Sequence, residues 1–163
     1  MSDDQVPTTE PGSTDPSQVR VKALAVVLDA DRSRHLVFRA RNQAGQDFHR
    51  PLGGGVEPGE RAAEAVVREI AEELGATFRP EAMLGVVENI FELDGQLGHE
   101  VVFLFTGTLA EADIVPAEGR VFHDNGDPGW AEWRPVHGDE DACPLYPDEL
   151  QRLLDDWLAR PTV

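Results

Sequence analysis

The stretch GGGVEPGERAAEAVVREIAEELGA, residues 53–76, decides the fold of this chain and carries its most informative chemistry. Apolar residues recur at spacings of three and four from Ala63 to Leu74, which predicts an amphipathic helix over residues 61–74. Gly75 follows at the place where a helix often ends on a glycine with positive φ. The glycines that precede the helix allow a tight turn and a close approach of the backbone to a ligand or a metal.

Three glutamates share one face of this predicted helix. Glu69 and Glu73 are four residues apart, and Glu72 is three residues after Glu69. Like charges at this spacing destabilise an isolated helix by about 0.2–0.5 kcal/mol per pair. A divalent cation such as Mg²⁺ would offset the repulsion, because Mg²⁺ binds carboxylate oxygens and keeps water for substrate phosphates. The alternative is a solvated acidic face, which is the usual fate of a charge run in an acidic chain.

The spacing of glycines, acids and arginine resembles the signature of the Nudix hydrolases, G-x5-E-x7-R-E-U-x-E-E-x-G-U, in which U is a bulky aliphatic residue. Gly54 is followed by Glu60 at the required distance, and REIAEELGA at residues 68–76 completes the match. Every fixed Gly, Glu and Arg is present. Ala76 is the one departure, since it is small for the final aliphatic position. A match at so many fixed positions is highly specific.

The resemblance implies an α/β (α+β) fold, an α/β/α sandwich around a mixed β-sheet, in which the motif forms a loop and helix that hold divalent metal. Mg²⁺ is the expected cofactor, and Mn²⁺ is the alternative. The resemblance also implies that the catalytic and metal-binding carboxylates are those of Glu69, Glu72 and Glu73, with the Gly53 carbonyl as a further metal ligand. Glu69 is the first choice for the general base.

A supporting role is implied for three other residues of the motif. Glu60 and Arg68 resemble the internal ion pair of the family, which ties the loop to the helix, and Gly54 belongs to the same loop. We expect these residues to hold the site together and not to take part in the reaction.

Outside the motif the pattern is one of strands interleaved with a second helix, which is typical of a single α/β or α+β domain. The strands are expected at residues 21–28, 35–41, 83–91, 100–109 and 130–135, a loop at 121–129, and the second helix at 147–160. The first two strands are expected to form a hairpin. Residues 1–18 are rich in Pro, Ser, Thr and acids and are predicted to be a disordered acidic tail, so the domain covers residues 19–163.

Two acids outside the motif are candidates for the site. Glu132 lies in a predicted strand where relatives often supply a further metal-site acid, and Glu100 is its competitor. For either, an ordinary exposed acid is the alternative. Asp124 and Asp127 are expected to be turn formers.

The charge of the chain limits its partners. Its 163 residues hold 14 Lys and Arg against 31 Asp and Glu, a formal net charge of −17, which argues against a nucleic-acid polymer as partner. A small phosphorylated ligand remains compatible with this charge if a metal supplies the positive counterpart. Phosphate contacts are expected from Arg39, Arg41 or Arg50, because Arg suits bidentate phosphate recognition, although a solvated Arg is the alternative for each.

The remaining features of composition point to the cytoplasm. No apolar run approaches the roughly 20 residues of a membrane span, and the N-terminus has no signal-peptide pattern. A single cysteine, Cys143, excludes an internal disulfide. The apolar segment EVVFLF, residues 100–105, would suit a homodimer interface, but the sequence leaves the oligomeric state open.

We therefore predict an Mg²⁺-dependent Nudix pyrophosphohydrolase that cleaves the pyrophosphate linkage of a small nucleoside diphosphate linked to a group X. Nucleoside triphosphates, ADP-ribose or other nucleotide sugars, and dinucleoside polyphosphates are all candidates, and the sequence does not choose among them. The alternative is a non-catalytic domain of the same fold that binds or senses a nucleotide. The three glutamates of the motif disfavour this alternative, because non-catalytic relatives usually lose at least one of them.

Overall fold

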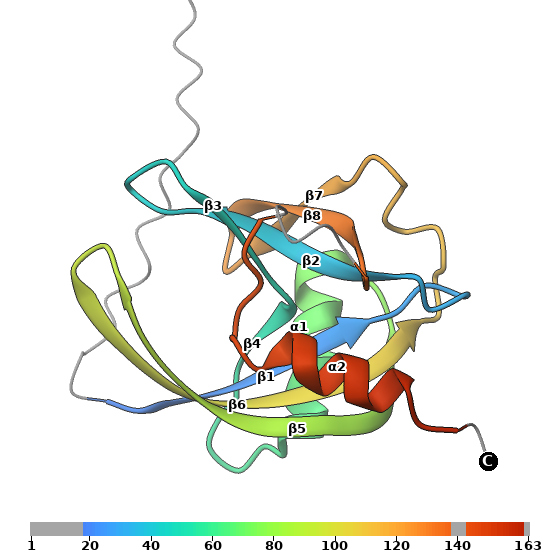
Figure 1. Cartoon of the computed structure of the whole chain (residues 1–163), viewed down its shortest axis with the longest axis horizontal. Helices are drawn as coiled ribbons and strands as arrows, with labels where there is room; N and C mark the ends of the chain where they lie inside the picture. Colours follow the sequence, from blue (N-terminus) through green and yellow to red (C-terminus); the bar gives the residue numbers. More distant parts are fainter. Residues whose placement is uncertain (1–17, 138–142, 162–163) are drawn as a thin grey trace, which may run out of the picture.

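The computed structural model describes residues 18–137 and 143–161, and the predicted acidic tail lies outside them except for its last residue. Two four-stranded sheets and two helices make up the described chain (Figure 1). The elements in order are β1 (Arg20–Val27), β2 (Arg34–Arg41), β3 (Asp47–Arg50), β4 (Leu52–Gly55), α1 (Ala62–Leu74), β5 (Phe78–Leu93), β6 (Gln96–Leu109), β7 (Arg120–Asp124), β8 (Asp127–Pro135) and α2 (Leu150–Leu158).

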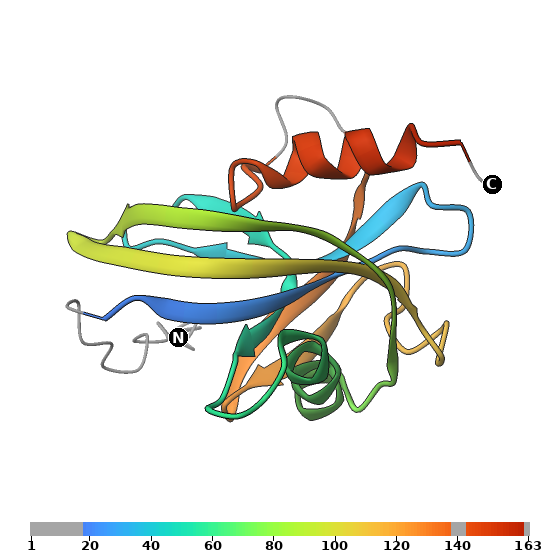
Figure 2. The ribbon, with the colours of Figure 1, turned by 90° about the horizontal axis from the view of Figure 1, so that it is seen from below.

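The two helices lie on opposite sides of the sheets, as the expected α/β/α sandwich requires (Figure 2). The first sheet has the order β4-β1-β6-β5, with β1 parallel to β6 and the other pairs antiparallel. The second sheet has the order β3-β2-β8-β7 and is antiparallel throughout. The fold is therefore a mixed α+β fold, as the sequence predicts.

The hairpin expected between the first two strands is wrong. β1 and β2 belong to different sheets and meet at a single bridge, between Leu28 and His35. The sequence of β1 contains a run of buried residues, Ala23 to Val27, which face the core on both sides of the strand. Such a strand is stable in the middle of a sheet, where both of its edges are paired, and β4 and β6 supply those pairs.

The loop expected at residues 121–129 is also wrong, because β7 and β8 form a hairpin there. Asn125 and Gly126 make its turn, with φ of 50° and 88°. An Asn-Gly pair with positive φ at both positions is the favoured two-residue connection between antiparallel strands. The turn brings Asp124, at the end of β7, opposite Asp127, at the start of β8.

Each helix covers its own part of the apolar core. The buried face of α1, which includes Val66, Ile70 and Leu74, packs on a cluster with residues from both sheets. The helix ends at Gly75 with φ of 66°, as predicted. Leu150 and Leu154 of α2 pack on a second cluster, and α2 is shorter than expected because it begins at Leu150. Neither described helix has the length and apolar character that crossing a membrane would require.

Candidate active site

The glycines of β4 bring the backbone into close contact with its neighbours. Gly53 pairs with Leu24 of β1 and has φ of 143°, and a Cβ added there would lie 2.2 Å from the Ala23 carbonyl oxygen. A Cβ on Gly54 would lie 2.4 Å from the Cδ atom of Glu69 on α1. Glycine is required at both positions because any side chain would separate β4 from β1 or from α1.

Arg68 ties the loop after β4 to helix α1. Its guanidinium donates hydrogen bonds to both carboxylate oxygens of Glu60, at 2.8 and 2.9 Å, and to the Gly55 carbonyl oxygen at 3.0 Å. It also donates to Glu69 at 3.0 Å and to the exposed Glu72 at 3.3 Å. Its hydrogen bonds lower the pKa of Glu60 to about 2, so this pair stays ionised. The predicted ion pair is thus present, and it also orients Glu69.

Glu73 is the buried carboxylate of the site. Its side chain is 6% exposed, accepts a hydrogen bond from the Gly53 amide, and has one oxygen, Oε2, with no hydrogen-bond partner. Burial raises its pKa to about 9, and the negative charges of Asp124 and Glu69 add to this shift. Burial also raises the pKa of Glu69, against the opposing effect of Arg68. Arg68 compensates the charge of Glu69, and Arg50 acts against the upward shift of the Glu73 pKa.

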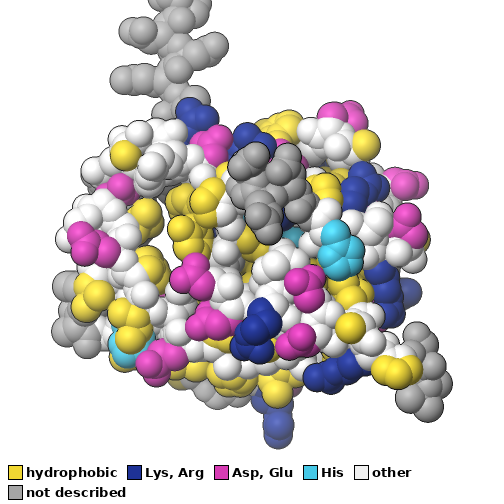
Figure 3. Space-filling model, viewed as in Figure 1, with side chains coloured by type: hydrophobic (Ala, Val, Ile, Leu, Met, Phe, Trp, Pro, Cys, Tyr) yellow, Lys and Arg dark blue, Asp and Glu magenta, His cyan; other side chains and the backbone are white. Residues whose placement is uncertain are grey.

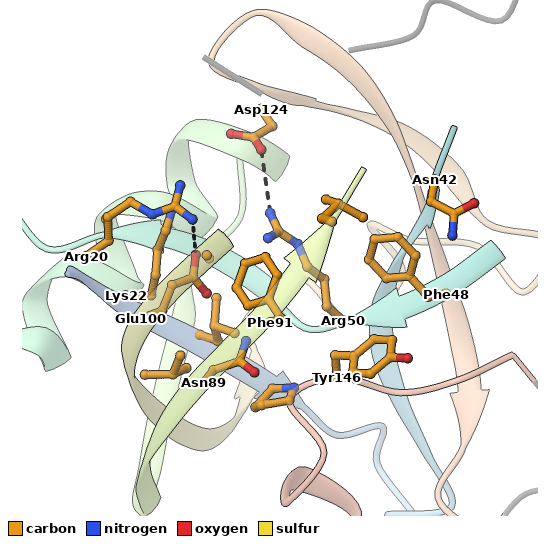
Figure 4. Close-up of a pocket in the computed structure, with 18 of the residues that line it drawn as sticks. Arg20, Lys22, Asn42, Phe48, Arg50, Asn89, Phe91, Glu100, Asp124 and Tyr146 are labelled. Atoms are coloured by element: carbon orange, nitrogen blue, oxygen red, sulfur yellow. Dashed lines mark ion pairs between the residues drawn. The ribbon is translucent and has the colours of Figure 1, made fainter. Parts of the chain in front are cut away.

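Part of the motif borders a cavity of about 810 Å³ between the two sheets (Figures 3 and 4), whereas Glu72 and Glu73 do not line it. Gly53, Gly54, Gly55 and Glu69 line it on the side of the motif. Three cationic residues line it, Arg20, Lys22 and Arg50. The lining acids are Asp47, Glu69, Glu92, Glu100 and Asp124, and the aromatic residues are Phe48, Phe91 and Tyr146. Figure 3 shows Lys and Arg side chains scattered among acidic side chains on the face it views.

The cations of the cavity are partly paired. Arg20 forms an ion pair with the buried Glu100 at 2.9 Å, and Arg50 lies 3.9 Å from Asp124. The pKa of Lys22 is lowered, mainly by burial and secondly by the charge of Arg50. A polyphosphate entering this cavity would meet Arg and Lys side chains next to the carboxylates of the motif.

The structure separates the predicted site residues into two groups. Arg50 and Glu100 line the cavity together with the glycines and Glu69. Arg39, Arg41 and Glu132 do not line it. Arg39 instead donates to Glu132 at 2.7 Å, and Arg41 forms an ion pair with Asp47 at 2.6 Å.

Strand alternation explains the separation. Residues of β2 and β3 that pair directly point to the same face of the sheet, and Arg39 pairs with His49 while Phe38 pairs with Arg50. Arg50 faces the cavity, so His49 and Arg39 face the other side. Glu132 accepts a hydrogen bond from His49 at 2.7 Å on that other side. Glu132 therefore has no place in the cavity.

The sequence analysis missed several residues of the cavity, among them the charged residues Asp124, next to the motif, and Lys22, on the strand paired with it. Asp124 was interpreted as a turn former. Lys22 was placed in the strand expected at residues 21–28 and given no role in the site. The Asn-Gly pair at residues 125–126 was the available signal for Asp124, since it predicts a hairpin with the aspartate at the strand end. Lys22 gave a weaker signal, a lone charged residue within an apolar strand.

The residues present fit a divalent cation. Within residues 18–137 and 143–161, no three His, Cys, Asp or Glu side chains converge in a ready-made metal cluster. The buried Glu73 oxygen nevertheless has no partner, and Glu69 and Asp124 lie near enough to raise the pKa of Glu73. Carboxylate oxygens brought together in this way are the donor set that Mg²⁺ or Mn²⁺ prefers.

Comparison with known proteins gives a family match over most of the chain. The model of the NUDIX domain matches residues 19–140. The RNA pyrophosphohydrolase of Erythrobacter litoralis is 30% identical over 162 residues, which cover 88% of this chain and 87% of that protein. The NAD-capped RNA hydrolase NudC of Deinococcus radiodurans is 34% identical over 124 residues, 76% of this chain, but this chain spans only 39% of the length of that relative.

Solved structures share the same architecture. The MutT protein of Methanosarcina mazei has a TM-score of 0.62 at 22% identity, over 87% of this chain and 96% of that one. A structure named UDP-X diphosphatase has a TM-score of 0.55 at 19% identity, over 90% of this chain and 66% of that one. At these identities the likeness is one of fold.

Proposed function

Because the chain belongs to the NUDIX domain family of hydrolases, which act on pyrophosphate bonds, we propose that it is an Mg²⁺-dependent pyrophosphohydrolase of a small nucleoside diphosphate linked to a group X. The observation that carries the proposal is the buried Glu73, whose oxygen has no partner, next to Glu69 at the wall of a cavity lined by Arg and Lys. A buried, unpaired acid is costly, and a metal-binding role accounts for that cost.

The metal is assigned to the carboxylates of the motif. Glu69 and Glu73 would hold Mg²⁺ together with the Gly53 carbonyl, and Glu72 is the third carboxylate of the set. Asp124 joins them because its charge acts on both Glu69 and Glu73. Bound Mg²⁺ would neutralise phosphate charge and lower the pKa of the attacking water.

The side chains of this protein then have separate tasks in hydrolysis. Arg50 and Lys22 would bind the phosphate oxygens and keep the pyrophosphate in the cavity. The water oxygen bonds to one phosphorus while the bridging P–O bond breaks, and the leaving phosphate keeps the electron pair. Glu69 is our choice to take the proton of the water, since it lines the cavity and Arg68 fixes its position.

A small substrate is favoured over RNA, although two relatives are named for RNA substrates. The net charge of −17 opposes the approach of a long polyanion, whereas a short one would be held by the bound Mg²⁺ together with Arg20, Lys22 and Arg50 in the cavity. Retention of Glu69, Glu72 and Glu73 disfavours the alternative of a nucleotide sensor without catalysis.

A hydrolysis screen tests the proposal. Nucleoside triphosphates, ADP-ribose, UDP-sugars, dinucleoside polyphosphates and a 5′-triphosphorylated oligoribonucleotide are each incubated with Mg²⁺, and products are identified by mass. We expect turnover of a small nucleotide that is lost with EDTA and in Glu73→Gln, but kept in Glu118→Gln, which makes the same charge change at an exposed position. Faster turnover of the oligoribonucleotide would overturn the small-substrate assignment. Binding of nucleotides without any product would favour the sensor.

A further inference from the structure

One wall of the cavity is a short segment between β8 and α2, residues 143–147, which we call the wall segment. Pro144, Tyr146 and Pro147 of this segment line the cavity (Figure 4). The segment belongs to no named strand or helix, and a single bridge joins it to β3. Its position therefore depends on contacts with its neighbours.

The backbone of His49 makes that bridge. β3 is an edge strand of the second sheet, and the wall segment pairs with its free edge, Leu145 opposite His49. The His49 amide donates to the Pro144 carbonyl oxygen at 2.7 Å, and the Tyr146 amide donates to the His49 carbonyl oxygen at 2.9 Å. Leu145 also packs against the apolar cluster under α2. Two backbone hydrogen bonds are a small attachment for a segment that borders a ligand cavity.

The side chain of His49 links this bridge to a polar network on the face of the second sheet that points away from the cavity. The imidazole is 6% exposed, and Arg134 donates to its Nδ1 at 3.0 Å. Because arginine has no acceptor, Nε2 carries the proton and donates it to Glu132 at 2.7 Å. Arg134 also donates to the Cys143 carbonyl oxygen. One guanidinium thus contacts both the imidazole and the wall segment.

The network draws on three strands of the sheet. Arg39 of β2 donates at 2.7 Å to the same Glu132 oxygen that accepts from His49 of β3, and both Glu132 and Arg134 lie on β8. Charged groups held partly out of water cost desolvation free energy that well-packed apolar residues would avoid. A task for the network accounts for that cost, and its hydrogen bond to Cys143 carries it beyond the sheet to the wall segment.

We propose that Glu132, His49 and Arg134 are positioning residues that hold the wall segment where it closes the cavity around the substrate. None of the three lines the cavity, so they act on the substrate only through the wall segment. The inference rests on the proposed function and adds to it a set of residues that controls substrate affinity.

The expected effect follows from the fraction of molecules whose wall segment is in place. When the network is weakened, that fraction falls, and the apparent affinity for substrate falls in proportion. The carboxylates of the motif lie on α1 and have no bond to the network, so the chemical step is expected to be unchanged once substrate is bound.

The single tyrosine of the chain, Tyr146, gives a direct reading of the wall segment. Protein labelled with fluorotyrosine has one fluorine resonance, which is compared between the wild type and Arg134→Met, a variant that loses the donors and keeps the length of the side chain. We expect the Arg134→Met resonance to split or to move toward its position in urea. Arg134→Lys, which keeps a cationic donor, is expected to lie close to the wild type.

Two further variants make this comparison specific. Arg120→Met is the matched control, because Arg120 also donates to a backbone carbonyl, that of Ile114 at 3.1 Å, and does not line the cavity. It should leave the resonance of the wild type unchanged. Glu132→Gln removes the charge that anchors His49 and should move the resonance in the same direction as Arg134→Met. It decides the question if circular dichroism shows that Arg134→Met does not fold.

Kinetics with the substrate found in the screen separate positioning from catalysis. In Arg134→Met we expect KM to rise about tenfold and kcat to change less than twofold, with most of the KM recovered in Arg134→Lys. An unchanged resonance in both Arg134→Met and Glu132→Gln, or a loss of kcat at unchanged KM, would overturn the positioning role.

Failure of the proposed function is distinguishable from failure of this inference. If the wild type hydrolyses nothing, the dissociation constant of ADP at fixed Mg²⁺, measured by calorimetry, replaces KM. Binding about tenfold weaker in Arg134→Met would then support the positioning role without catalysis, and equal binding would overturn it. Hydrolysis that depends on Glu73, with an unmoved tyrosine resonance in the variants, would leave the proposed function standing alone.

Discussion

The carboxylate of Glu69 lies directly against the backbone of Gly54, so close that a Cβ on Gly54 would stand 2.4 Å from Glu69 Cδ and 2.6 Å from each of its oxygens. The two residues are 15 positions apart, one in β4 and one in α1, and Arg68 joins the same two elements through Gly55 and Glu69. The loop and the helix therefore position the candidate base as one unit.

Substitution of Gly54 by Ala is expected to displace Glu69 and lower kcat by about 100-fold, because a misplacement of about 1 Å has effects of this size. Gly55→Ala is the matched control, since a Cβ on that neighbouring glycine meets no atom within 4 Å. Steady-state kinetics with the substrate found in the screen compares the two variants. Equal loss in both, or none in Gly54→Ala, would contradict a positioning role for the contact.

Glu73 is expected to make the metal-free protein less stable as the pH rises. Its pKa is raised from 4.5 to about 9, so between these values the folded chain keeps a proton that the unfolded chain has lost. The stabilising contribution is fully present below pH 4.5 and is lost as the pH rises through 9. Between these values the free energy of unfolding is expected to fall by up to about 1.4 kcal/mol per pH unit.

Denaturant unfolding in EDTA at several pH values measures this effect. The decrease of the unfolding free energy with rising pH is expected to be smaller in Glu73→Gln and to be unchanged in Glu118→Gln. Saturating Mg²⁺ is expected to displace the proton and to stabilise the wild type more than Glu73→Gln. A stability curve that is the same for the wild type and Glu73→Gln would show that this carboxyl has an ordinary pKa.

Asp124 is expected to act in the site, whereas its neighbour across the hairpin, Asp127, is not. Asp124 lines the cavity and raises the pKa of Glu73, but Asp127 is exposed and does not line it. Asp124→Asn should weaken Mg²⁺ binding and lower kcat/KM by about 10–100-fold, as loss of a carboxylate near a metal commonly does. Asp127→Asn should change the affinity for Mg²⁺ and the kcat/KM by less than twofold. Magnesium titrations of activity measure both, and similar values for the two variants would remove Asp124 from the site.

His35 is expected to contribute to acid sensitivity away from the site. It is fully buried, neither ring nitrogen has a hydrogen-bond partner, and burial together with Arg134 lowers its pKa from 6.5 to about 3. The unfolded chain therefore binds a proton below pH 6.5 that the folded chain excludes until about pH 3, so stability falls as the pH drops through this range.

The comparison of His35→Leu with His137→Leu, an exposed control, isolates this effect. The loss of unfolding free energy between pH 6.5 and 4 should be smaller in His35→Leu, by up to about 1.4 kcal/mol per pH unit. His137→Leu should follow the wild type. An unchanged acid slope in His35→Leu would mean that His35 takes up its proton in the folded state.

The motif helix, its glycine end and the pairing of Glu60 with Arg68 could be predicted from the sequence because they depend on short-range spacing. Helical periodicity brings residues three and four apart together in any fold, and a match at fixed positions carries that geometry with it. The family and the fold class follow from the same stretch. The partners of β1 do not, since a buried strand gives no signal of which strands lie beside it.

Outside the motif, the tertiary structure decided which of the candidate residues line the cavity. Arg39 and Arg50 have the same chemistry in the sequence, yet the pairing of β2 with β3 turns one away from the cavity and the other toward it. Asp124 and Tyr146 come from elements distant from the motif and reach the cavity through a hairpin turn and a backbone pairing with His49. The sequence by itself determined the chemistry of the motif, which is local. Strand register, which depends on contacts between distant segments, decided the rest of the site.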